Sequence, residues 1–167
     1  MQDLAVTPPL FKETVFDDPS VRDLSRVGVI DIGSNSVRLV VFDGAARSPA
    51  YFFNENIMCG LGVGLSLNGR LNPEGRNRAI SAIARFKQLA KSMGIKELTA
   101  VATAAVRTAS DGQDFCEEVM EKTGQFIAVI SGEEEAKLSA QGVLTGWPGA
   151  YGLVCDLGGT SLELAEI

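Results

Sequence analysis

The sequence contains one short pattern twice, and that repetition limits the folds available to it. VIDIGSNSVRLVVFD, residues 29–43, and LVCDLGGTSLELAEI, residues 153–167, each contain an apolar run, an aspartate, a turn of small residues and a second apolar run. β-Branched residues flanking Gly, Ser and Asn are typical of hairpins. The repetition therefore predicts two tight strand–turn–strand units, with Asp31 and Asp156 near the ends of their first strands.

The segments between the two units alternate between helical and strand patterns. Asn72 before Pro73 predicts a helix start, and Ser131 followed by Glu134 predicts a capping box at another. Periodicity predicts helices over 73–93, 111–122 and 132–144, and strands over 27–32, 37–43, 48–58, 98–102, 126–130, 151–157 and 161–167. This order predicts an α/β fold of the ribonuclease-H-like, actin-like kind, with a mixed central sheet of about five strands flanked by helices.

Length and charge restrict the organisation and the partners. With 167 residues, 46% of them hydrophobic, the chain has the size of one domain, and we expect a flexible leader over 1–26 followed by one lobe over 27–167. A net charge of −6 argues against binding nucleic acid or an anionic membrane. The first residues lack the pattern of a signal peptide, and the three cysteines form no C-x-x-C pair, so we expect a cytoplasmic protein.

The sequence contains no histidine, which excludes several kinds of active site. Neither a Ser-His-Asp nor a Cys-His arrangement is possible, so acid–base chemistry falls to carboxylates, lysine, tyrosine or cysteine. The chain also lacks G-x-x-x-x-G-K-[ST], and GLGVGL from Gly60 lacks the third glycine of a dinucleotide fingerprint. P-loop and Rossmann sites are therefore excluded as well.

The two turns are candidate phosphate clamps. Glycine lets backbone N–H groups approach an anion, hydroxyls add donors, and a nearby aspartate can hold a hard cation or its water shell. The alternative is that each turn is only a hairpin, where the same residues are common for conformational reasons. The residues concerned are Gly33, Ser34, Asn35, Ser36, Gly158, Gly159, Thr160 and Ser161.

Three further charged residues are candidates, each with an ordinary alternative. Glu135, on the first turn of a predicted helix, could orient a water for attack on phosphorus, or it could be one of three solvated glutamates. Arg107 follows a predicted strand and could bind a phosphate with two hydrogen bonds, or form a surface ion pair. Glu163 shares a strand face with Ser161 and is either a solvated outer residue or a second carboxylate for a metal.

Five segments in this order resemble the exopolyphosphatase and guanosine pentaphosphate phosphohydrolase (Ppx/GppA) family, within the superfamily of actin, heat-shock chaperones and sugar kinases. They are VIDIGSNSVRLVV, LGVGLSLNGRLNPEG, AVATAAVRTASDGQDF, AVISGEEEAKL and VCDLGGTSLEL. The resemblance implies hydrolysis of a terminal phosphoanhydride of polyphosphate or guanosine pentaphosphate, with magnesium as the cofactor.

By motif, the resemblance makes Glu135 the catalytic base. It assigns Asp156 and Glu163 to the other active-site carboxylates associated with the metal, and Asp31 to the strand-end aspartate of the first loop. It assigns Arg107 to the phosphate-contacting arginine and the two small-residue turns to phosphate loops.

The chain departs from the family pattern in two ways. Thr160 stands where the family usually has a third glycine, and Leu162 where it usually has threonine. The family also carries a second lobe, which is absent from this chain, so we expect an exposed apolar face and a homo-oligomer.

Two other functions remain open: an ATP-dependent kinase of the same superfamily, and a sensor that binds polyphosphate or guanosine tetraphosphate without cleaving it.

Overall fold

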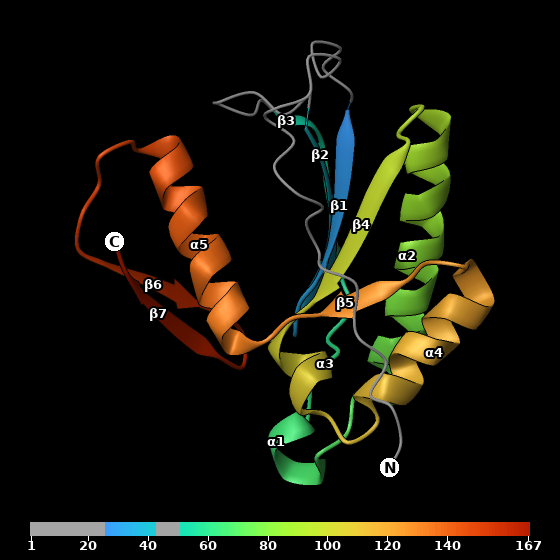
Figure 1. Cartoon of the computed structure of the whole chain (residues 1–167). Helices are drawn as coiled ribbons and strands as arrows, with labels where there is room; N and C mark the ends of the chain where they lie inside the picture. The colour runs from blue at the N-terminus through green and yellow to red at the C-terminus, as the bar shows by residue number, and fades with distance from the viewer. Residues whose placement is uncertain (1–25, 43–50) are drawn as a thin grey trace, which may run out of the picture.

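The computed structural model describes residues 26–42 and 51–167, and its centre is a five-stranded sheet with the order β3-β2-β1-β4-β5 (Figure 1). β1 pairs antiparallel with β2 and parallel with β4, so the sheet is mixed, as predicted. Apart from Arg26, the expected leader lies outside the described residues, as does the start of the predicted third strand. The strands of this sheet are β1 (Val27–Ile32), β2 (Ser36–Phe42), β3 (Tyr51–Met58), β4 (Glu97–Ala102) and β5 (Ile127–Val129).

Two of the longer helices begin where capping signals predicted. In α2 (Pro73–Ser92) the Asn72 side chain accepts a hydrogen bond of 2.7 Å from the Gly75 N–H, and Pro73 takes the first helical position. In α5 (Gly132–Gly146) both bonds of the capping box between Ser131 and Glu134 are present. The remaining helices are α1 (Leu65–Asn68), α3 (Ala104–Thr108) and α4 (Gly112–Thr123). The sequence did not predict α1 or α3, because so few residues show no periodicity.

Alternation along β1 decides which side chains enter the core. Ile30 and Ile32 are fully buried in one core with Ile83 and Phe86 of α2. Because successive strand residues point to opposite faces, Asp31 faces away from α2 and is exposed. In Figure 1, α2 and α4 lie on one side of the sheet and α5 on the other. No helix in the described part of the chain is both long and apolar enough to span a bilayer.

The last two strands, β6 (Leu153–Leu157) and β7 (Leu162–Glu166), form a separate antiparallel sheet next to α5 (Figure 1). Burial in this hairpin is the reverse of what polarity suggests. Glu163 is only 8% exposed, whereas Leu157 is 80% and Leu164 52% exposed. The solvated outer position considered for Glu163 is therefore wrong. Whether 27–167 is one lobe stays a prediction.

Candidate functional site

The two small-residue turns are closed by equivalent backbone hydrogen bonds. In the first, the Gly33 N–H donates to the Ser36 carbonyl at 3.0 Å, and in the second the Gly158 N–H donates to the Ser161 carbonyl, also at 3.0 Å. The flanking strands pair in register on both sides of each turn. The prediction of two hairpins is thus confirmed.

The two turns, far apart in the sequence, meet in the structure. Ser34 Oγ lies 2.6 Å from Thr160 Oγ1, and 126 positions separate these residues. A Cβ added to Gly159 would lie 2.9 Å from Asn35 Nδ2 and 3.3 Å from Ser34 Cβ, so a side chain at this position would require the first turn to shift. Glycine at 159 therefore permits this close contact, and the structure places the turns side by side as the phosphate-clamp hypothesis requires.

The adjoining turns leave several backbone donors without acceptors. Among the described residues, nothing accepts a hydrogen bond from the N–H groups of Ser34, Asn35, Gly159 or Thr160. Successive backbone N–H groups in a turn form a concave anion site when no internal acceptor takes them. Two such turns in contact provide donors from two directions, which suits the tetrahedral oxygens of a phosphate.

Arg107, Glu135 and Glu163 form one partly buried ionic cluster. From the last turn of α3, Arg107 Nη1 donates to Glu135 Oε2 at 2.9 Å and to the Ile130 carbonyl at 2.9 Å, and Nη2 lies 3.5 Å from Glu163 Oε1. The side chains of Glu135 and Glu163 are 15% and 7% exposed. Both residues therefore lie inside the site, and the alternatives of a surface ion pair for Arg107 and a solvated Glu135 are not what the structure shows.

Asp31 and Asp156 approach the same cluster. Partial burial raises the pKa of Asp31, Arg38 acts against that rise, and the negative charges of Glu135 and Asp156 add to it. The carboxylates from β1, α5 and β6 therefore lie within electrostatic range of one another. Asp156 Oδ2 accepts a hydrogen bond from Ser139 Oγ, which holds the carboxylate against α5.

Two further side chains, Ser139 and Arg38, act on the predicted carboxylates, and the sequence contained a signal for each. Ser139 is four residues after Glu135, and residues with that spacing share a helix face. Arg38 lies opposite Asp31 in the register of the β1–β2 hairpin, and a two-residue turn after Gly33 fixes that register.

The residues present fit magnesium only in part. Among the residues that the structure describes, no three His, Cys, Asp or Glu side chains lie close enough together to hold a metal ion. Protein sites commonly hold magnesium through one or two carboxylates together with substrate phosphates, so three are not required. Asp31, whose pKa is raised first by partial burial and then by the charges of Glu135 and Asp156, fits such a site.

Comparison with known proteins places the chain in a family. The model of the Ppx/GppA phosphatase family matches residues 40–167. Exopolyphosphatase 1 of Mycobacterium bovis is 34% identical over 144 residues, which are 84% of this chain and 42% of that protein, and exopolyphosphatase 1 of Mycobacterium leprae is 32% identical over the same proportions. The chain thus spans less than half the length of these curated relatives.

Solved structures agree with the sequence relatives. An exopolyphosphatase from Cytophaga hutchinsonii superimposes with a TM-score of 0.77 at 30% identity, covering 84% of this chain and 46% of that one. The Aquifex aeolicus Ppx/GppA phosphatase gives 0.74 at 30% identity, covering 84% and 47%. The order of the five-stranded sheet and these neighbours identify the actin-like ATPase fold. With most of its length matched by one family model, the chain belongs to the Ppx/GppA phosphatase family.

Proposed function

We propose that the protein containing this chain releases the terminal phosphate of inorganic polyphosphate by hydrolysis. One observation carries the proposal: the 2.6 Å contact between Ser34 Oγ and Thr160 Oγ1 joins two turns that have unused backbone donors. Membership of a phosphatase family and the name exopolyphosphatase 1 on relatives 34% identical support the same reaction.

The two turns bind the terminal phosphate. The N–H groups of Ser34, Asn35, Gly159 and Thr160 donate to its oxygens, and Arg107 contributes a positive charge at the neighbouring α3. These groups stabilise the charge that develops on the phosphate oxygens during transfer. Because the donors belong to the backbone of two hairpins, they keep their positions without a large ordering cost.

Glu135 orients the attacking water. Arg107 bonds its Oε2, and no described residue donates to Oε1, so Oε1 can accept a hydrogen bond from a water molecule. The water oxygen forms a bond to the terminal phosphorus while the bond from that phosphorus to the bridging oxygen breaks. The proton of the water passes to Glu135, and the electron pair of the broken bond leaves with the shortened chain.

Magnesium, when bound, neutralises negative charge on the phosphate oxygens. Asp31 and Asp156 are the residues that would hold it. Glu163 fits a different task, since Arg107 contacts its Oε1 and Ser161 Oγ donates to its Oε2 at 3.1 Å. We assign to Glu163 the positioning of Arg107 and Ser161.

A second lobe would complete this site. The relatives are more than twice as long as their matched part, and the β6–β7 hairpin presents leucines to solvent on the face opposite Glu163. An apolar sheet face of this kind is usually covered by another layer of structure. We propose that the second lobe packs there and encloses the substrate, and that without it the chain self-associates.

The test is phosphate release from polyphosphate by the complete gene product carrying Glu135→Gln. Loss of a general base typically slows a reaction by about 10²- to 10⁴-fold, and we expect a loss of that size with the fold retained. Glu133→Gln is the matched control, because Glu133 lies on the same helical turn but is exposed and paired with Lys137 at 2.6 Å. An unchanged rate with Glu135→Gln would remove this residue from the mechanism.

The same assay separates the alternatives. Faster release from guanosine pentaphosphate than from polyphosphate would move the substrate to the nucleotide. Phosphate transfer that requires a second acceptor would indicate a kinase. Tight binding of polyphosphate measured by calorimetry, together with no release under any condition, would indicate a sensor.

A further inference from the structure

The segment Cys59–Gly62 runs behind the first turn and holds its carbonyl groups. β3 ends at Met58, which pairs with Ser36 at the start of β2, so the chain leaves β3 directly alongside the turn. The N–H groups of Cys59 and Gly60 both donate to the Asn35 carbonyl at 2.8 Å, and the Gly62 N–H donates to the Ser34 carbonyl at 2.8 Å. Both carbonyls at the tip of the turn are thereby fixed.

Fixing these carbonyls also fixes the donors on the other side of each peptide. In a planar trans peptide the C=O and the following N–H point in opposite directions. The Ser34 carbonyl is held by Gly62, so the Asn35 N–H, which belongs to the same peptide unit, points away from the Cys59–Gly62 segment. The direction of this anion-binding donor thus depends on the segment behind the turn.

α2 holds that segment in turn. The Asn72 N–H donates to the Leu61 carbonyl at 2.9 Å, and a Cβ added to Gly75 would lie 2.7 Å from the Gly60 carbonyl oxygen, so the helix packs closely against the segment. Arg78 supplies the charged contact: its Nε and Nη2 donate to the Cys59 carbonyl at 2.9 and 2.6 Å.

The peptide unit between Cys59 and Gly60 connects Arg78 to the first turn. The Cys59 carbonyl and the Gly60 N–H belong to the same plane, so a guanidinium that binds the carbonyl orients the N–H that bonds Asn35. A charged donor on the carbonyl also polarises the peptide and strengthens the bond that its N–H makes. Arg78 therefore acts on the first turn without touching it.

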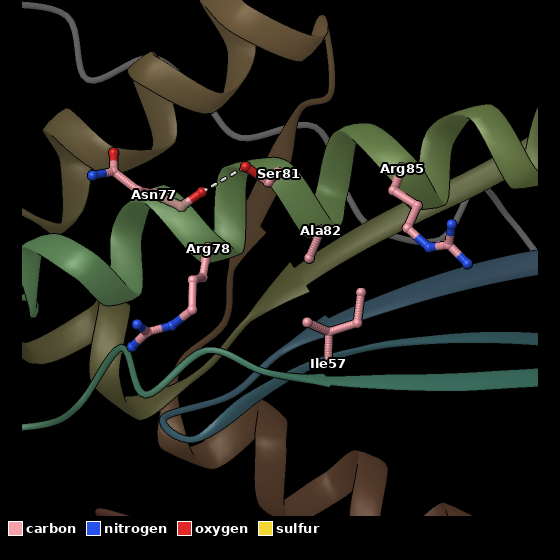
Figure 2. A pocket seen from close by; sticks show the side chains of 6 residues that line it. All are labelled: Ile57, Asn77, Arg78, Ser81, Ala82 and Arg85. Atoms are coloured by element: carbon pink, nitrogen blue, oxygen red, sulfur yellow. Dashed lines mark hydrogen bonds between the residues drawn. The ribbon is translucent and has the colours of Figure 1, made fainter.

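We propose that Arg78 is a positioning residue for phosphate binding, which orients the first turn through the Cys59–Gly60 peptide. The proposal rests on the proposed function, because it concerns the turn that binds the terminal phosphate. Figure 2 shows Arg78 on α2 at one end of a surface pocket of about 390 Å³, with Arg85 on the same helix at the other end and Ile57 between them.

Arg85 provides a matched control. It lies seven residues further along α2 and lines the same pocket, and its side chain is 57% exposed against 50% for Arg78. Its guanidinium binds the Glu55 carboxylate at 3.0 and 3.3 Å and contacts no carbonyl of the turn region. Arg78 likewise has one exposed ion pair, with Glu74 at 3.5 Å, so both substitutions remove a surface charge and a surface ion pair. An effect of Arg78→Gln that Arg85→Gln does not share therefore belongs to the contact with the Cys59 carbonyl.

The experiment has two readouts. In the 167-residue chain, amide hydrogen exchange at Cys59, Gly60 and Gly62 measures how well the segment is held. In the complete gene product, calorimetry with tripolyphosphate measures the affinity of the site. Substitution of residues that orient metal ligands typically costs about 10- to 100-fold in affinity. By analogy, we expect Arg78→Gln to weaken binding within that range and to accelerate exchange at the three amides.

Arg78→Lys should fall between the wild type and Arg78→Gln, because lysine keeps the charge but not the two-pronged donor geometry. It also serves where Arg78→Gln fails to fold. The proposal would be overturned if the three amides exchanged at the same rate in Arg78→Gln and in Arg85→Gln. If Arg78→Gln does not fold, the same comparison is made between Arg78→Lys and Arg85→Gln. Absence of any tripolyphosphate binding by the wild type would instead refute the proposed function, and the exchange comparison would still decide whether Arg78 holds the segment.

Discussion

The two sheets of this chain differ in the burial of their apolar residues. In the five-stranded sheet, Ile30 and Ile32 of β1 are fully buried and the acid between them, Asp31, is exposed. In the β6–β7 hairpin, Glu163 is buried and the neighbouring leucines 162 and 164 are exposed. In both sheets, successive side chains point to opposite faces. Within residues 26–42 and 51–167, only the five-stranded sheet has its apolar face covered by helices.

The difference indicates what each sheet contributes. The five-stranded sheet supplies stability, because α2 and α4 close its core. The hairpin supplies Asp156, Glu163 and a turn to the candidate site, while its apolar face has no cover among the described residues. The site therefore lies at the junction between a complete layer and an incomplete one.

The largest expected difference between the two sheets is in stability. Phe86→Ala in α2 removes a side chain with 0% exposure and should lower the free energy of unfolding by about 3–5 kcal/mol. Leu157→Ala in β6 should change it by less than about 0.5 kcal/mol, since surface substitutions rarely do more. Urea denaturation of the 167-residue chain measures both. Equal losses would mean that the hairpin has a covered face after all.

A smaller effect on the free energy of unfolding is expected at two aspartates, Asp111 and Asp31, whose pKa values are shifted in opposite directions. Asp111 is 3% exposed, accepts from the Leu71 N–H at 2.9 Å and binds Arg76 at 2.9 Å. Burial alone would raise its pKa, but these hydrogen bonds outweigh burial and lower it. Asp111→Ala leaves the Leu71 N–H without its acceptor and leaves Arg76 with Glu118 as its remaining carboxylate partner. It should cost about 1–3 kcal/mol at pH 7. Asp31, with a raised pKa, should behave in the opposite way: Asp31→Asn should stabilise the chain slightly.

The two aspartates should change the stability of the chain in opposite directions as the pH rises. The stabilisation from Asp111 is present above its ordinary pKa of 3.8 and is lost as the pH falls through its lower folded value. The cost of ionised Asp31 develops as the pH rises from 3.8 through its raised folded value. At acidic pH the free energies of unfolding of both variants should therefore approach that of the wild type. Asp111→Ala should approach it from lower stability and Asp31→Asn from higher stability. Stabilisation by both substitutions at pH 7 would contradict this assignment.

The smallest expected effect on stability comes from substitutions in the β6–β7 hairpin that should change self-association of the chain instead. The double substitution Leu157→Ser and Leu164→Ser should leave the free energy of unfolding nearly unchanged but reduce self-association of the 167-residue chain, because it removes apolar surface from the uncovered face. Light scattering after size exclusion measures the association. Leu67→Ser is the control, since Leu67 is 92% exposed but lies on α1. A monomeric wild type at high concentration would remove the basis for this prediction.

Local sequence signals predicted much of the fold. The two hairpins, the starts of α2 and α5, and the mixed five-stranded sheet follow from turn residues, capping residues and periodicity. The helices α1 and α3 were missed because each is about one turn long. The burial of Glu163 could not be predicted either, because alternation separates the two faces of a strand without saying which one the rest of the molecule covers.

The sequence by itself determined the local chemistry: two turns of small residues, an aspartate before each, and an acidic helix start. These features depend on backbone preferences over a few residues, and such preferences are present in the chain before it folds. Only the tertiary structure decided that Ser34 meets Thr160, that Arg107 binds Glu135, and that Arg78 reaches the first turn through Cys59. Those contacts join residues distant in the sequence, and packing of the sheet and helices, rather than any local preference, brings them together.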